Sequence, residues 1–454
     1  MRRSLWLFST LTALAPTLAS AQSAAQIPDK YREVATRIIA AAQADSAGAW
    51  NRIAELTDTF GHRLSGSLAL EQAIDWTVAT MKADGLANVR KEKVMVPHWV
   101  RGAESLTLIS PRKQALPMLG LGGSIATPPQ GITAEVMVVA SFEELTQRAA
   151  EAKGKIVLYD AEWRDYGYNG AFRRQGAIAA AKAGAVASLA RAAGPYSMRT
   201  PHTGNMSYDS TVKKIPHASV TAEDAMMMRR MIARGQKVVV TLKMSAKTLP
   251  DAPSHNVMGE LVGREKPNEI VVMGGHIDSW DVGQGAMDDA GGVVVAWEAI
   301  RLLKKLGLTP RRTIRVVGWT NEENGGKGGQ AYRDAHQQEI HQLAIESDGG
   351  VFSPLGFGFT GPAESRKAVE AIASLLAPVG ANKIGPSGGG ADIGPIMQTG
   401  VPGMGLEVDG SRYFWFHHTD ADTSDKLDPK EVQRCVAVMA VMAYIAADLE
   451  QSLR

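Results

Sequence analysis

Five short motifs between residues 274 and 423 carry the side chains that could hold a pair of metal ions. They offer imidazoles and carboxylates, many of them beside glycine. The motifs are Gly274-Gly275-His276-Ile277-Asp278, Met287-Asp288-Asp289-Ala290-Gly291-Gly292, Asn321-Glu322-Glu323-Asn324-Gly325-Gly326, Glu346-Ser347-Asp348-Gly349-Gly350 and Phe416-His417-His418-Thr419-Asp420-Ala421-Asp422-Thr423. Histidine nitrogens and carboxylate oxygens are zinc ligands, and two zinc ions can hold and activate a water molecule. The motifs therefore predict two Zn²⁺ per chain and a hydrolytic reaction.

The first two motifs predict one ligand with an orienting partner and one bridge. His276 is a candidate ligand, and we expect the Asp278 side chain to accept a hydrogen bond from the other imidazole N–H, which fixes the tautomer. Asp288 is the candidate bridging carboxylate, with one oxygen for each ion. Asp289 is expected to orient the backbone. The alternatives are a His-Asp pair in a surface turn and an acidic cap on the following helix.

The remaining motifs supply the base and the other ligands. Adjacent side chains diverge on an extended loop, so we assign Glu323 to metal and Glu322 to the general base. A solvated glutamate pair is the alternative. Asp348 follows an apolar run, where an unpaired charge is costly, and is a further ligand. The last ligand comes from the pair His417 and His418.

The strands that precede these motifs predict a common location for them. Apolar runs at Glu269–Met273, Thr313–Gly318 and Gln342–Ile345 end just before His276, the glutamate pair and Asp348. Ligand crevices of open α/β sheets lie beyond the carboxyl ends of their strands. We therefore expect a mixed, largely parallel sheet flanked by helices, with the metal site at one edge. A glycine-rich loop, Ser387–Asp392, either borders the substrate pocket or is a plain linker.

The whole chain divides into a leader and three further segments. Residues 1–21 resemble a cleavable signal peptide, with Arg2 and Arg3 before an apolar stretch and Ala19-Ser20-Ala21 at its end. The alternative is a short membrane anchor. The mature protein is therefore expected to be periplasmic or secreted. Residues 22–110 are interpreted as the N-terminal part of the domain that carries the motifs, 111–246 as an inserted α/β domain, and 247–454 as the catalytic part.

Several elements are predicted with definite bounds. In the N-terminal part, Ser67 is expected to cap a helix and Val89–Val100 and Ser105–Ile109 to be strands. In the insertion, strands are expected at Glu135–Ala140 and Lys155–Tyr159, and an alanine-rich helix at Gly176–Ala193. A long buried helix is expected from about Asp428, containing the single cysteine, Cys435. Its apolar run is shorter than the roughly 20 residues that span a bilayer.

Composition excludes some classes of partner. The 454 residues are 45% hydrophobic and 21% charged, and 49 basic residues nearly balance 47 acidic ones, for a net charge of +2. Without a basic run, we expect no nucleic-acid partner and no membrane partner after signal removal. One cysteine allows no intrachain disulfide, so packing and metal binding must stabilise the fold.

The motif set resembles the co-catalytic dizinc exopeptidases of the leucyl aminopeptidase and glutamate carboxypeptidase type, and among them the carboxypeptidase Q branch. The resemblance is carried by residues 274–289, by Asp58–Ser67 and by Tyr413–His418, and covers nearly all of the mature chain. It implies that the insertion is a protease-associated domain and makes a homodimer plausible. It also implies that the base is Glu322, that His418 is chosen over His417, and that the metal ligands are His276, Asp288, Glu323, Asp348 and His418.

The reaction expected from this resemblance and inventory is hydrolysis of dipeptides or short peptides. A hydroxide held between the two ions would attack, with Glu322 as general base. A strict aminopeptidase of the same family is the alternative, and it needs an acidic group that holds the free amine of the substrate. A non-catalytic protein that keeps metal for structure is a third possibility.

Overall fold

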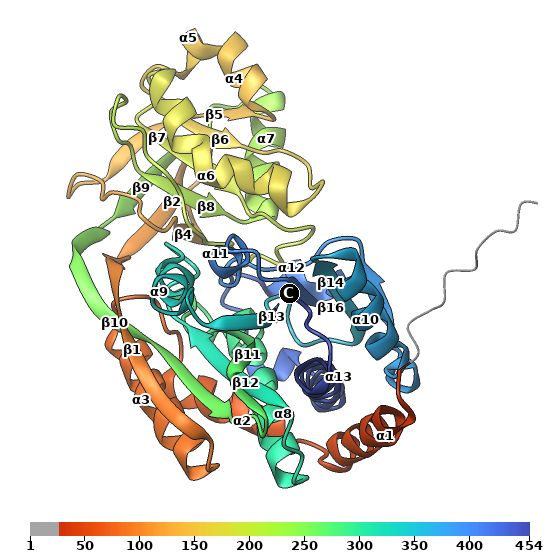
Figure 1. Ribbon diagram of the computed structural model, residues 1–454. Coiled ribbons are helices and arrows are strands. Elements are labelled where there is room, and N and C mark those ends of the chain that lie inside the picture. Colours follow the sequence, from red (N-terminus) through yellow and green to blue (C-terminus); the bar gives the residue numbers. More distant parts are fainter. Residues whose placement is uncertain (1–26) are drawn as a thin grey trace, which may run out of the picture.

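The protein is described by a computed structural model that covers residues 27–454 (Figure 1). The predicted signal peptide lies outside these residues. The chain forms two lobes, each built on an eight-stranded sheet. The lobe with the first sheet contains both ends of the described chain, and the second lobe is formed by the middle of the sequence, shown in orange, yellow and green at the top of Figure 1.

The first sheet is mixed, as expected, with a parallel centre. Its four central strands, in the order β12, β11, β13 and β16, run parallel, and antiparallel strands flank them. The strands in spatial order are β1 (Ala87–Val100), β10 (Lys247–Leu261), β12 (Arg312–Trp319), β11 (Lys266–His276), β13 (Ile340–Glu346), β16 (Gly403–Val408), β14 (Pro354–Thr360) and β15 (Lys383–Gly385).

Helices bury both faces of this sheet. Along β11, Val271 and Met273 join a core cluster with residues of the helices on one face, while Ile270 and Val272 join a second cluster on the other. Successive strand residues point to opposite faces, so this division follows from the continuous apolar run. The first face packs against α3 (Leu68–Ala83), α8 (Gly291–Lys305), α10 (Ala363–Ser374) and α13 (Pro429–Asp448), and α1 (Asp29–Ala44) and α2 (Gly48–Phe60) pack in turn against α8 and α13. The second packs against α9 (Lys327–His336) and α11 (Gly394–Met397).

Helix ends follow local sequence signals. The Ser67 hydroxyl accepts a hydrogen bond from the backbone of Leu70, which confirms the predicted cap of α3. Asp428 caps α13 in the same way, with Pro429 at the first helical position. Cys435 lies buried within this helix. Within residues 27–454, no helix combines the length and hydropathy of a membrane span.

The second sheet is also mixed. Its order is β3 (Gln114–Leu116), β2 (Glu104–Ser110), β9 (Val239–Met244), β5 (Ile132–Val139), β6 (Ile156–Tyr159), β7 (Ala187–Arg191), β8 (His217–Val220) and β4 (Met118–Gly120). The helices of this lobe are α4 (Phe142–Gln147), α5 (Ala149–Ala152), α6 (Tyr166–Lys182) and α7 (Ala222–Ala233).

The predicted helix Gly176–Ala193 is wrong in its second half. Helix α6 begins earlier, where Asp165 caps it, and ends at Lys182. Gly184 follows in the left-handed conformation that glycine adopts readily. Residues 187–191 then form β7, a central strand with its side chains buried. Alanine favours helices, so the alanine-rich composition extended the predicted helix into a strand that packing within the sheet stabilises.

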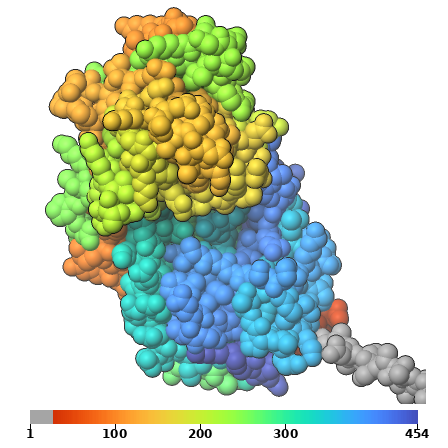
Figure 2. Space-filling model, turned by 90° about the horizontal axis from the view of Figure 1, so that it is seen from above, coloured from red at the N-terminus to blue at the C-terminus, as the bar shows by residue number. Residues whose placement is uncertain are grey.

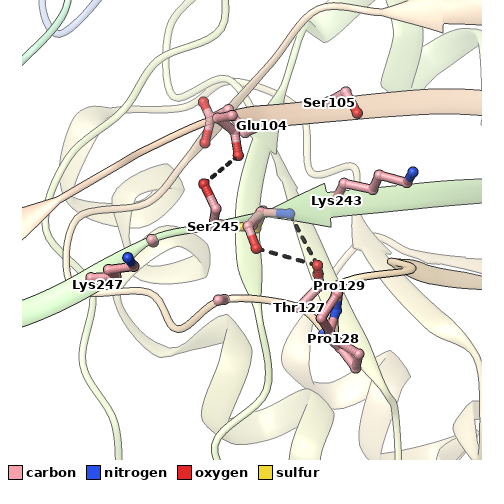
Figure 3. A pocket seen from close by; sticks show the side chains of 12 residues that line it. Glu104, Ser105, Thr127, Pro128, Pro129, Lys243, Ser245 and Lys247 are labelled. Atoms are coloured by element: carbon pink, nitrogen blue, oxygen red, sulfur yellow. Dashed lines mark hydrogen bonds between the residues drawn. The ribbon is translucent and has the colours of Figure 1, made fainter.

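The chain passes between the two sheets at adjacent points. It leaves β1 to enter β2 at Glu104, and it leaves β9 at Met244 to enter β10. The strand β2, which we assigned to the peptidase part, therefore pairs with β9 in the second sheet. A pocket of about 470 Å³ lies at this crossing, lined by Glu104, Thr127, Lys243 and Lys247 among others (Figure 3).

Candidate metal centre

The parallel strands bring four of the motifs to one edge of the first sheet. His276 is the last residue of β11, the glutamate pair follows β12, and Asp348 follows β13. Asp288 lies in η1 (Ala286–Ala290), a short irregular helix that leads into α8. The histidine pair follows β16 by way of η3 (Gly410–Arg412) and the single-turn helix α12 (Tyr413–Phe416). The expected location beyond the strand ends is the one observed.

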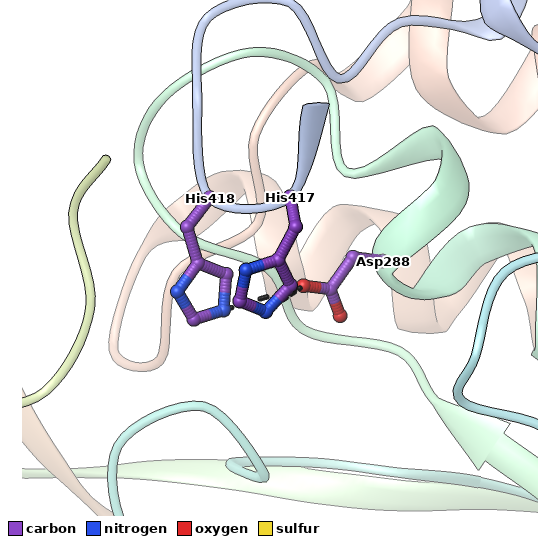
Figure 4. A group of neighbouring side chains, drawn as sticks. All are labelled: Asp288, His417 and His418. Carbon is purple, nitrogen blue, oxygen red and sulfur yellow. Dashed lines mark ion pairs between the residues drawn. The ribbon is translucent and has the colours of Figure 1, made fainter. Parts of the chain in front are cut away.

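Asp288 stands between two histidines. Its Oδ1 lies 3.1 Å from Nε2 of His276, and its Oδ2 lies 3.2 Å from Nε2 of His418. Figure 4 shows His417 and His418 side by side with both rings directed at this carboxylate. The Nε2 atom of His417 is 3.4 Å from Oδ2 of Asp288, and its ring stacks on that of His418 with centroids 3.6 Å apart.

His276 and His418 each lie close to a second carboxylate as well. Oδ1 of Asp348 lies 3.4 Å from Nε2 of His276, and Oε2 of Glu323 lies 2.9 Å from Nε2 of His418. The five predicted ligands therefore form two groups that share Asp288. Three overlapping sets of donor atoms lie within 4.8 Å of one another: Asp288 with His417 and His418, His276 with Asp289 and Asp348, and His276 with Asp288 and Glu323.

The expected hydrogen bond from His276 to the Asp278 carboxylate is wrong in its acceptor. The Nδ1 atom of His276 lies 2.9 Å from the backbone carbonyl of Asp278, while the nearest carboxylate oxygen is 3.7 Å away. A carbonyl only accepts, so Nδ1 carries a proton and Nε2 is the nitrogen that faces the centre. The carboxylate accepts instead from the backbone N–H groups of Glu322 at 3.1 Å and Glu323 at 3.4 Å.

A tight turn presents the glutamate pair. Asn321, directly before it, has φ of 65°, in the left-handed region that asparagine tolerates better than most residues. Its side chain donates to Ser65 at 2.9 Å and accepts from the backbone of Lys327 at 3.2 Å. The turn is thereby held at both ends. Glu323 is buried, and Glu322 is partly exposed.

Two buried acids orient the backbone around Asp288. Asp289, as expected, accepts from the N–H of His276 at 3.1 Å and of Gly292 at 2.9 Å. Asp422 accepts from the N–H groups of Ala286, Met287 and Asp288, at 3.1, 2.7 and 3.2 Å. No role for Asp422 was predicted, although it lies within the histidine motif. These bonds determine where the shared carboxylate points.

Arg63 is a further residue that sequence reasoning missed. It is fully buried and donates to the carbonyls of Ile277, Gln284 and Gly285 at 2.7–2.9 Å. It therefore ties the loop after β11 to the segment before Asp288. The only sequence signal was its place within Asp58–Ser67, where the family resemblance was already noted.

Two carboxylates beside the centre have buried oxygens without a hydrogen-bond partner. The loop Ser387–Asp392 folds over Glu346, whose Oε2 accepts from the backbone of Asp392 at 3.0 Å and of Ile393 at 2.8 Å. The other oxygen of Glu346 and both carboxylate oxygens of Asp392 are buried without a hydrogen bond. By contrast the guanidinium of Arg412 is paired with Glu431 at 2.8 Å.

The concentration of acids perturbs their protonation. Burial, together with the charges of Asp348 and Glu323, raises the pKa of Glu322 well above its usual value. Burial and the nearby Asp288 raise the pKa of Glu323 to about 7 and that of Asp422 to about 7. Burial opposes protonation of His276, yet its bonds to Asp288 and Asp348 raise the pKa of that imidazole well above its usual value. Such shifts are typical of functional sites.

The donor set fits bound cations. Oδ2 of Asp288 and Oε1 of Glu323 are buried without hydrogen-bond partners. An unpaired buried charge is costly. A cation bound between these oxygens and the Nε2 atoms of His276 and His418 would neutralise it. Imidazole and carboxylate ligands without thiolates suit zinc and related divalent metals.

Comparison with known proteins gives a consistent picture. The profile of Peptidase family M28 matches residues 256–443. Carboxypeptidase Q of Xenopus laevis is 48% identical over 427 residues, which cover 93% of this chain and 91% of the relative. Human carboxypeptidase Q is 48% identical over 406 residues, covering 89% and 86%.

Solved structures share the fold. A Peptidase M28 precursor from Shewanella amazonensis SB2B superposes with a TM-score of 0.91 at 35% identity, over 94% of this chain and 98% of that chain. BSAP, a zinc aminopeptidase from Bacillus subtilis, gives a TM-score of 0.66 at 21% identity, over 89% and 98%. The second likeness concerns the fold alone.

Proposed function

The chain belongs to peptidase family M28 and is a metallopeptidase, and we propose that it is a dizinc exopeptidase that hydrolyses dipeptides or short peptides. The observation that carries this proposal is the position of Asp288, whose two oxygens face two different histidines at 3.1 and 3.2 Å. Zinc is favoured by the donor set. We further propose that the enzyme is exported and that the second lobe, which includes β2, is a protease-associated domain.

The proposed ligand assignment divides the five residues into two groups. His276 and Asp348 would hold one ion, Glu323 and His418 the other, and Asp288 would contribute an oxygen to each. His417 also lies close enough to Asp288 to be considered as a metal ligand, but its stacking on His418 favours a supporting role. Asp278 supports both groups, since its carbonyl orients His276 and its carboxylate holds the amides of the glutamate pair.

Glu322 is the proposed general base. When bound, zinc ions supply Lewis-acid chemistry, polarising a carbonyl and making a bound water more acidic. The Glu322 carboxylate takes the proton of the attacking water and delivers it to the nitrogen of the leaving amine. The partly exposed side chain can reach substrate, whereas its neighbour Glu323 is buried against His418.

The unpartnered acids favour a second candidate, an aminopeptidase or a dipeptidase that requires a free amine. Asp392 has two buried oxygens without donors, and Glu346 has one. The burial of Asp392, with the charges of Glu346 and Glu322, raises the pKa of its carboxyl well above its usual value. An ammonium group of the substrate would supply the missing donors and charge. This is the acidic group that an aminopeptidase needs.

Blocked substrates separate these readings. Rates would be compared on a free dipeptide, its N-acetyl form and its C-terminal amide, each with and without chelator and added zinc. A carboxypeptidase cleaves the N-acetyl form and fails on the amide. An aminopeptidase does the reverse, and a strict dipeptidase cleaves neither blocked form. Full activity in chelated, metal-free protein would overturn the proposal itself.

A further inference from the structure

The second lobe contacts the segment Tyr413–His418, which carries the histidine pair. The ring centroid of Tyr166 lies 5.0 Å from that of Phe414 and 4.9 Å from that of His417. The ring centroids of Tyr196 and Trp415 are 6.1 Å apart. In Figure 2 the yellow part of the second lobe sits directly above the blue C-terminal part of the first. The aromatic run before the histidines is therefore a contact between lobes.

Within this contact, Thr203 and His418 are joined by two hydrogen bonds. The backbone N–H of Thr203 donates to the carbonyl of His418 at 2.9 Å. Nδ1 of His418 lies 3.3 Å from the carbonyl of Thr203. Because a carbonyl only accepts, this bond requires a proton on Nδ1 and leaves Nε2 as the nitrogen that faces Asp288 and Glu323.

The backbone at His418 needs such support. Its φ is 58°, a left-handed conformation that is uncommon for residues other than glycine. The bond from Thr203 holds the carbonyl of this residue in place. The conformation and the ring orientation of His418 are thus supported by Thr203 of the other lobe, and Nη1 of Arg173 in that lobe also lies 3.4 Å from Nδ1 of the ring.

Thr203 is itself held by two buried arginines. Arg173, on α6, donates from one guanidinium nitrogen to the Thr203 carbonyl at 3.1 Å and from the other to the Tyr166 hydroxyl at 2.6 Å. Arg101 donates to the Thr203 hydroxyl at 3.1 Å and, from Nε, to Asp281 at 2.8 Å. A side chain at Gly204 would collide with the Arg173 guanidinium, so glycine is required there.

We propose that the second lobe completes the metal centre, with Arg173 and Thr203 as positioning residues for the ligand His418. The inference rests on the proposed role of His418. In most protein zinc sites a carboxylate or carbonyl orients each histidine ligand, and loss of that partner weakens metal binding about 10–100-fold. Here the orienting carbonyl comes from the loop between β7 and β8 of the other lobe. The affinity for one of the two ions therefore depends on docking of the lobes.

The test measures metal binding rather than activity alone. Full-length Arg173→Met, Arg173→Lys and Tyr166→Phe proteins would be titrated with Co²⁺ against a competing chelator, and the visible cobalt spectrum recorded. We expect Arg173→Met to lower the affinity for one of the two bound cobalt ions by about 10–100-fold and to change the visible spectrum. Arg173→Lys keeps a donor and should recover part of the loss. Tyr166→Phe should give a smaller effect in the same direction.

The neighbouring arginine is a matched control. Arg174 lies on the same helix, but its guanidinium donates only to the carbonyl of Gly167 at 3.0 Å. Arg174→Met should bind cobalt like the parent. The inference is overturned if Arg173→Met and Tyr166→Phe, both folded by circular dichroism, bind two ions with parental affinity and spectrum. A parent that binds no metal would instead overturn the proposed function.

Discussion

The Asp278 carboxylate reaches the proposed base through the backbone, because its Oδ1 accepts a hydrogen bond from the N–H of Glu322 at 3.1 Å. Its Oδ2 accepts from the next N–H at 3.4 Å. Asp278 is fully buried, so no water replaces these bonds if they are lost. The residue thus places the loop that follows β12, while its own carbonyl orients His276.

Asp278→Asn should disturb this loop without changing the size of the side chain. One acceptor oxygen becomes an NH₂ group that faces a backbone donor. We expect kcat to fall about 10–100-fold while metal content, measured by atomic absorption, stays near the parental value. Asp251→Asn, at an exposed carboxylate on β10, is the control. Parental kcat in Asp278→Asn would show that the loop does not depend on these bonds.

Glu322→Gln removes the proposed base and keeps its shape. Metal content near that of the parent should be retained, because Glu322 is not a proposed ligand, while kcat falls by roughly 10²–10⁴-fold. The exposed Glu364 offers a matched Glu→Gln control on α10. A variant as active as the parent would refute the assignment of the base. If the parent binds metal but hydrolyses no peptide, the protein is a metal-containing binding protein.

Zinc should stabilise the protein more as pH rises from about 5 to about 8. Burial first, then neighbouring charges, raise the pKa of Glu323, Glu346 and Asp422 to about 7, so these groups bind protons in the folded metal-free protein that they lose on unfolding. Burial opposes protonation of His418, but Glu323 and Asp288 raise its pKa well above the usual value. In both cases the folded state binds more protons, so stability without metal falls with rising pH.

The measurement is the difference in Tm between zinc-loaded and chelated protein at both ends of this pH range. Bound zinc replaces those protons. Its contribution to the stability of the folded protein therefore increases as the pH rises and the protons dissociate. A Tm difference that is equal at both pH values, or larger in acid, would contradict the prediction.

Asp422→Ala should lower both stability and metal affinity. It leaves three buried N–H groups without acceptors, at Ala286, Met287 and Asp288. We expect a loss of about 1–3 kcal/mol in the free energy of unfolding, from urea denaturation of chelated protein. Asp420, two residues earlier and exposed, provides the control Asp420→Ala. Equal effects of the two substitutions would rule out the anchoring role of Asp422.

Much of this architecture could be predicted because its signals are local. The signals are apolar runs, cap residues such as Ser67, and acids at strand ends. Each of them indicates structure from the few residues around it. Parallel strands then bring their carboxyl ends to one edge without further information. The five proposed ligands follow from this rule and from the family resemblance. The break between α6 and β7 was missed because alanine favours a helix, and packing within the second sheet overrides that local preference at residues 187–191.

What the sequence by itself determined is the set of donor groups and the sheet edge at which they gather. Tertiary structure alone decided which atoms meet there. Asp278 uses its carbonyl for His276 and its carboxylate for the loop, and Asp422 rather than Asp420 turns inward. Thr203 lies more than 200 residues from His418 in the chain, yet orients it. Such contacts depend on how the two lobes pack, and no short-range pattern encodes that geometry.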